Sequence, residues 1–99
     1  MGGMNLVAIE LLEARIKVLE NKLEEQHKIA FTTKNQCEAL REYLTELQKE
    51  DVDEETLKLV QDRLEEHYKK NVEAVAEFEG IKVKIEENEE MIKILEGSA

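Results

Sequence analysis

One stretch decides the fold of this 99-residue chain: Lys49-Glu50-Asp51-Val52-Asp53-Glu54-Glu55-Thr56. It is the clearest interruption between two long segments of helical pattern, in a chain that contains no proline. The Asp53 carboxylate can accept hydrogen bonds from the free amides of a following helical turn. Glu54 and Glu55 suit that turn because the helix dipole favours negative charge at its N-terminus. The stretch therefore predicts a turn that leads into a second helix.

Apolar residues recur outside this stretch at alternating steps of three and four, which are the a and d positions of a heptad repeat. The pattern predicts a helix over about 5–49, capped by Asn5, and a helix over about 54–96, stopped by Gly97. A connection over about 50–53 is so short that the helices must run antiparallel. We therefore expect an all-α fold, a long antiparallel helical hairpin or two-helix coiled coil, in a single domain over 1–99. The two stripes are Ile9, Leu12, Ile16, Leu19, Leu23, Gln26, Ala30, Thr33, Cys37, Leu40, Leu44, Leu47 and Leu57, Val60, Leu64, His67, Asn71, Ala74, Phe78, Ile81, Ile85, Asn88, Ile92, Leu95.

Folding the chain at Val52 pairs the two stripes layer by layer, with apolar residues opposite each other at both ends. The polar positions meet halfway, where Thr33 is opposite Asn71 and Cys37 is opposite His67. Such a layer can fix the register of a coiled coil. One Cys and one His lack the paired ligand spacing of a zinc site, and two packed helices offer no pocket for a Cys–His nucleophile. We expect a polar register layer here, with no metal, no cofactor and no catalytic residue.

Two segments are weak helix formers. Thr32-Thr33-Lys34-Asn35 has low helix propensity, and Gly80 costs about 1 kcal/mol in a helix interior. Turns at both places would give the alternative fold, a compact four-helix bundle made from one chain.

The charge balance excludes several classes of protein. Lys and Arg number 14 and Asp and Glu number 24, so the net charge of -10 argues against direct nucleic-acid binding through phosphates. The low aromatic content of 4% argues against an all-β domain. A single cysteine fits a reducing, cytoplasmic compartment. No apolar run is long enough to cross a bilayer and no signal peptide is visible, so we expect no membrane partner.

The apolar residues outside the stripes are the most informative feature. One group lies at g and c heptad positions, which fall on the same side of an antiparallel pair, and we call it the g/c flank. We expect it to be an interface for a protein partner, either a second copy in a homodimeric four-helix bundle or another coiled-coil protein. Lys22 and Lys84 are like charges on that flank, which favours acidic groups of another chain nearby. The g/c flank is Leu11, Val18, Ile29, Tyr43, Leu59, Met91 and Ile94, and a second group, at b and e positions, is Phe31, Tyr68, Val72 and Val75.

The function that these features favour is a non-enzymatic protein–protein interaction module, such as a scaffold, an adaptor or an assembly subunit. Three alternatives stay open. The hairpin with its acidic tip of Asp51, Asp53, Glu54 and Glu55 resembles Gre-type transcript-cleavage factors in architecture, which implies docking into RNA polymerase and holding of a magnesium ion. Long antiparallel hairpins also resemble prefoldins, which implies a holding chaperone. The acidic second half could instead mimic a nucleic acid and inhibit a DNA-binding protein.

Overall fold

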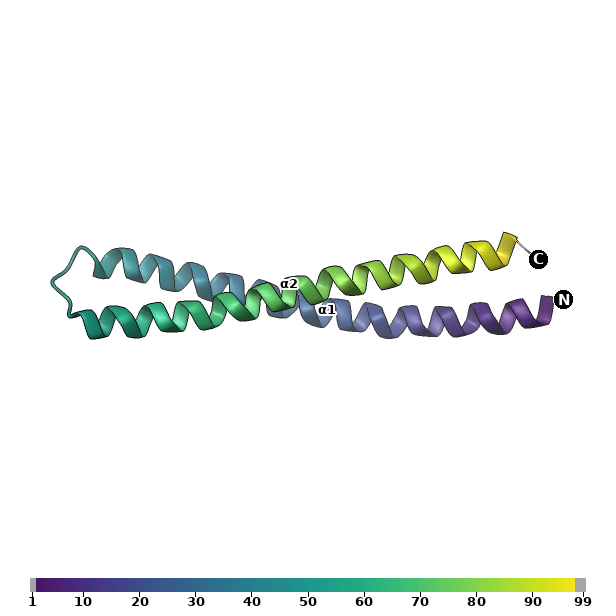
Figure 1. The fold of residues 1–99 in the computed structure, drawn as a ribbon, viewed down its shortest axis with the longest axis horizontal. Coiled ribbons are helices and arrows are strands. Elements are labelled where there is room, and N and C mark those ends of the chain that lie inside the picture. The colour runs from purple at the N-terminus through teal and green to yellow at the C-terminus, as the bar shows by residue number, and fades with distance from the viewer. Residues whose placement is uncertain (1, 98–99) are drawn as a thin grey trace. The chain divides into compact units, whose positions relative to one another are not determined.

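Two helices make up the computed structural model, which describes residues 2–97 and the side chains of residues 5–97. Helix α1 spans Gly2–Leu47 and helix α2 spans Glu54–Gly97, and no strand occurs within this described part (Figure 1). The all-α helical hairpin predicted from the sequence is therefore confirmed.

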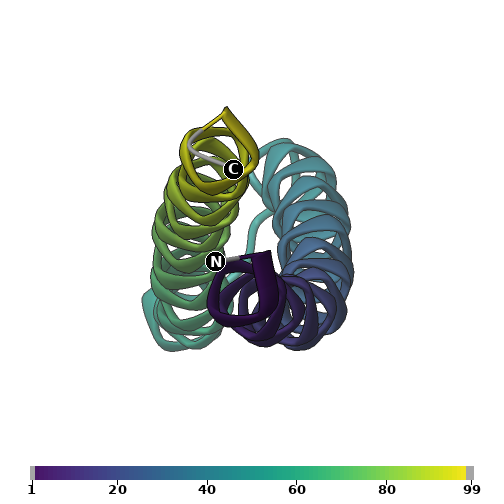
Figure 2. The ribbon, with the colours of Figure 1, turned by 90° about the vertical axis from the view of Figure 1, so that its right-hand side faces the viewer.

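The helices form two compact units, which we describe separately. Unit 1 contains Met1–Gln26 of the first half and Glu77–Ala99 of the second. Unit 2 is the continuous segment His27–Ala76, which includes the connection between the helices. In each unit a segment of α1 packs beside an antiparallel segment of α2. In unit 1 the beginning of α1 and the end of α2 lie at the same end, as the end-on view shows (Figure 2). The expectation of a single domain stays a prediction.

The a and d stripes are the buried faces of both helices. Every stripe residue is buried or half-buried, whereas almost every other side chain in residues 5–97 is exposed. Burial is deepest at Thr33, Cys37, His67, Ala74 and Ile81, each with 5% or less of its surface accessible. Large side chains elsewhere in the stripes remain half-buried, because only one neighbouring helix covers them. The heptad pattern thus predicted the packing face of each helix residue by residue.

Both ends of α1 differ from the sequence expectation. Helix α1 begins at Gly2, so Asn5 is not its N-cap, and the Asn5 amide nitrogen donates a hydrogen bond to the Leu95 carbonyl, 3.4 Å away. Helix α1 ends at Leu47 rather than near residue 49. The amides of Lys49 and Glu50 there bond three residues back, at 3.1 and 3.0 Å, which tightens the last turn and ends the α-helix.

The start of α2 agrees with the prediction. The Asp53 carboxylate accepts a hydrogen bond from the Thr56 backbone N–H at 3.2 Å, so Asp53 is the N-cap. Val52 and Leu57 are both half-buried and occupy the positions of a hydrophobic staple around that cap. Helix α2 continues through Gly97, which has no positive φ. Gly97 is therefore the last described helical residue and lacks the left-handed conformation of a glycine stop.

Both helices are continuous through their weak segments. Helix α1 runs through residues 32–35 and helix α2 runs through Gly80 without a turn. The alternative single-chain four-helix bundle is therefore wrong. At Thr33 the hydroxyl donates to the Ile29 carbonyl at 2.8 Å, so this polar side chain is satisfied within its own helix.

Candidate functional site

The polar register layer lies in unit 2. The Asn71 amide nitrogen of α2 donates to the Ala30 carbonyl at 2.8 Å and to the Thr33 hydroxyl at 3.0 Å, both on α1. These two hydrogen bonds join the helices with Asn71 opposite Thr33, which is the register predicted from the sequence for this layer. Thr33 and His67 are the buried polar residues of the described chain.

Cys37 and His67 are both buried and both belong to unit 2. Cys37 is a free thiol with 3% of its surface accessible. The Nδ1 atom of His67 is buried and has no hydrogen-bond partner in the described structure. Within residues 2–97 no group of three or more His, Cys, Asp or Glu side chains is arranged to hold a metal ion. The layer therefore offers packing and helix-to-helix hydrogen bonds, and no cluster of ligands.

The acidic tip is the exposed end of unit 2. Asp51, Asp53, Glu54 and Glu55 are all exposed. Hydrogen bonding from the Thr56 side chain, and then from its backbone N–H, holds the pKa of the Asp53 carboxyl below its ordinary value. One of the four carboxylates is thus already used to cap α2, and Glu54 and Glu55 lie in its first turn.

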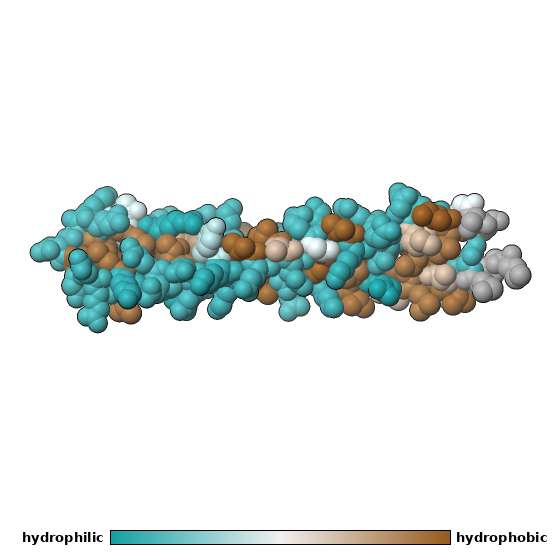
Figure 3. Space-filling view, viewed as in Figure 1, coloured by the Kyte–Doolittle hydropathy of each residue, from teal (hydrophilic) through white to brown (hydrophobic). Residues whose placement is uncertain are grey.

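The g/c flank divides between the two units, and all of its seven residues are exposed. Leu11, Val18, Met91 and Ile94 belong to unit 1, whereas Ile29, Tyr43 and Leu59 belong to unit 2. In unit 1 apolar surface gathers near the chain's ends (Figure 3). Large apolar side chains in water favour association, so this flank is the strongest candidate for a binding surface.

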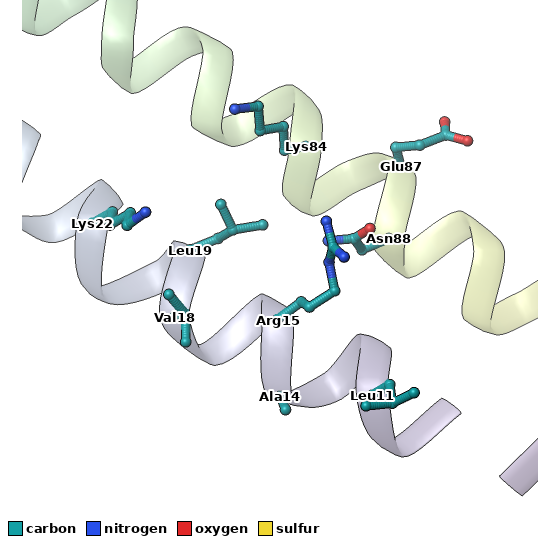
Figure 4. A pocket seen from close by; sticks show the side chains of 9 residues that line it. All are labelled: Leu11, Ala14, Arg15, Val18, Leu19, Lys22, Lys84, Glu87 and Asn88. Carbon is teal, nitrogen blue, oxygen red and sulfur yellow. The ribbon is translucent and has the colours of Figure 1, made fainter. Parts of the chain in front are cut away.

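A groove lies along the g/c flank of unit 1. Its volume is about 650 Å³, and both Leu11 and Val18 line it (Figure 4). Arg15, Lys22 and Lys84 line it as well, with Glu87 as its single acidic residue. Three cations and one acid give this groove a positive charge on a chain whose net charge is -10.

The b and e group gathers on unit 2. Phe31, Tyr68, Val72 and Val75 are exposed, with 63% of the Phe31 surface accessible. A hollow of about 270 Å³ there is lined by Phe31, Val75 and the polar Asn71, among others. It is smaller than the groove of unit 1.

Sequence reasoning missed three exposed apolar side chains, Leu6, Val7 and Val83. Leu6 occupies an e position ahead of the first stripe residue. Val7 and Val83 occupy f positions, which lie farthest from the partner helix. A search of every heptad position, rather than of the flanks alone, would have found them.

Comparisons with protein families, with curated proteins and with solved structures gave no match to this chain. Among residues 2–97 neither helix has a stretch apolar enough, over sufficient length, to span a membrane. The arrangement of the site itself is therefore the basis for assigning a function.

Proposed function

We propose that this chain is a non-enzymatic protein–protein interaction module that binds a second copy of itself through the g/c flank and forms a four-helix bundle. The observation that carries the proposal is the exposure of Leu11 and Val18 along a groove of about 650 Å³. A helical hairpin needs only its a and d stripes to hold together, so extra apolar residues at g and c positions have no role within the chain. A four-helix bundle covers those positions.

The role that follows is that of a scaffold, an adaptor or a subunit of a larger helical assembly. Its partner on the g/c flank is a second copy of the same chain, and its place is the reducing interior of a cell. The buried free thiol of Cys37 supports that location, since oxidising compartments favour paired cysteines. Packing residues, rather than reactive groups, carry this function.

Sedimentation equilibrium of the full chain at micromolar concentration tests the proposal, with a dimer expected. The double variant Leu11→Gln, Ile94→Gln should shift the equilibrium to monomer, because both residues belong to the g/c flank. The matched control is Val7→Gln, Val83→Gln at the f positions. Leu11 and Val83 are both 63% exposed, so the two changes remove comparable apolar surface from different faces.

A monomeric wild-type chain would contradict self-association. Equal weakening of the dimer by both double variants would contradict the assignment of the interface to the g/c flank.

A further inference from the structure

Six charged residues occupy g and c positions of unit 1, and the four nearest Gly80 form a basic level and an acidic level. The other two, Arg15 and Glu87, lie nearer the chain's ends. Lys22 and Lys84 line the groove from opposite helices and lie on either side of Leu19 (Figure 4). Within the described part of the chain neither lysine forms an ion pair. Two glutamates lie on the same flank, farther from the chain's ends. Glu25 is at a c position, three residues after Lys22, and Glu77 is at a g position, seven residues before Lys84. A basic level and an acidic level therefore follow each other along one flank.

Gly80 lies between these two levels, at a c position of α2. It is four residues before Lys84 and three residues after Glu77, which places it about one helical turn from each. A Cβ built at Gly80 would meet no atom within 4 Å, and the residue has no positive φ. Nothing inside the chain requires glycine at this position. The missing side chain would instead let the backbone of another helix come close.

We infer that the second copy binds antiparallel across this flank, about a two-fold axis at Gly80, so that Lys22 meets Glu25 and Lys84 meets Glu77 of the second copy. This inference rests on the self-association proposed above. A two-fold axis midway between the levels places each basic level opposite the other copy's acidic level. Parallel, in-register copies would place lysines opposite lysines, which is unfavourable. Charge complementarity thus selects both the partner and its direction.

Charge-reversed variants test whether the two levels face each other. Lys22→Glu, Lys84→Glu makes both levels acidic, and Glu25→Lys, Glu77→Lys makes both basic. Each variant alone should raise the dimer Kd on the order of tenfold or more at low salt, and the effect should shrink at high salt. An equimolar mixture should restore a heterodimer. The matched controls, Lys17→Glu, Lys93→Glu and Glu10→Lys, Glu79→Lys, make the same changes at b positions and should leave the Kd within about threefold of wild type.

Disulfide cross-linking tests the position of the axis. A residue on a two-fold axis meets its own counterpart, so Gly80→Cys should form an interchain disulfide rapidly under mild oxidation. The comparison is Ala14→Cys, at a position that lines the same groove. In the inferred arrangement the two copies of Ala14 are roughly 30 Å apart, so that variant should cross-link slowly or not at all. The wild-type chain, whose Cys37 is buried, is the blank.

The outcomes separate this inference from the proposed function. If the wild-type chain dimerises but the mixture restores no heterodimer, or Ala14→Cys cross-links as fast as Gly80→Cys, the antiparallel arrangement is overturned and self-association stands. If the wild-type chain is monomeric, both are overturned.

Discussion

Asn71 and Thr33 join the two helices of unit 2 by a hydrogen bond of 3.0 Å between the Asn71 Nδ2 and the Thr33 Oγ1. The same amide nitrogen also reaches the Ala30 carbonyl at 2.8 Å. These contacts are directional, whereas apolar contacts along the stripes tolerate small slips. This pair of residues therefore sets the register of α1 against α2 within unit 2.

Removing one partner of this bond should cost more than removing both. We expect Thr33→Val alone to destabilise the chain by about 1 kcal/mol, because the half-buried Asn71 amide loses one of its two acceptors. The double variant Thr33→Val, Asn71→Leu should recover that loss or exceed wild-type stability. Urea unfolding followed by circular dichroism measures the double-mutant cycle. Strict additivity of the two changes would show that the hydrogen bond contributes nothing to stability.

His67 should be replaceable by an apolar residue. Its Nδ1 is buried without a partner, and an unsatisfied buried polar atom costs about 1–3 kcal/mol. His67→Leu should therefore leave the melting temperature unchanged or raise it. Thermal melting with and without added zinc checks this result. A wild-type chain that melts much higher with zinc, while His67→Leu does not respond, would contradict the assignment of His67 to packing.

Asp53 should make stability depend on pH at the acidic end. The folded pKa of its carboxyl lies below the ordinary value, so its contribution is complete above the unfolded pKa and is lost as the pH falls through the folded pKa. Asp53→Ala should lower the melting temperature at pH 7, whereas Asp53→Asn keeps the cap but removes this pH dependence. Melting curves between pH 2 and pH 7 measure both effects. Asp51→Ala is the control, and an equal loss of stability in it would contradict the capping role of Asp53.

Truncation of the stripe should cost most where burial is deepest. Ile81 has 5% of its surface accessible, and we expect Ile81→Ala to lose about 2–5 kcal/mol. Leu44→Ala should cost less, because Leu44 is only half-buried and its site can fill with water. Denaturant unfolding at a protein concentration below the dimer Kd measures the loss in the free energy of unfolding for each variant. The reverse order would contradict the packing described for the stripes.

Gly80→Ala should stabilise the single chain. The added methyl group meets no neighbouring atom, and alanine is more favourable than glycine in a helix interior by about 1 kcal/mol. Gly97→Ala, at the last described residue of α2, should change stability much less because helix ends fray. Denaturant unfolding at nanomolar concentration compares the two. A destabilised Gly80→Ala chain would show that glycine is needed within the helix pair.

The period of the apolar residues made most of the fold predictable. Steps of three and four define a buried face, so the sequence alone assigns Leu19 and Ile85 to the side of each helix that faces its neighbour. The N-cap role of Asp53 could also be predicted, since Asp is a preferred N-cap residue and Glu54 and Glu55 suit the first turn of a helix. The pairing of Thr33 with Asn71 followed from counting outward from Val52. Local chemistry and period agree at all of these positions.

Other features depend on geometry that a linear pattern does not contain. Asn5 has the side chain of an N-cap, yet the helix begins before it and its amide nitrogen bonds to Leu95 instead. The lack of a hydrogen-bond partner for the buried Nδ1 of His67 depends on where its neighbouring atoms lie, which the sequence does not give. The sequence predicts a flank of apolar residues where the groove lies. The volume of the groove, and the fact that Arg15 and Lys84 line it together, depend on how far apart the helices lie.

The hydrogen bond between Asn5 and Leu95 has a practical consequence for labelling the protein. Because it joins the start of α1 to the end of α2, a fluorophore and a contact quencher attached beside these two residues begin close together in unit 1. Fraying of either helix separates them, so the loss of quenching reports local opening in real time. The same pair could therefore follow how binding events tighten or loosen that end of the molecule.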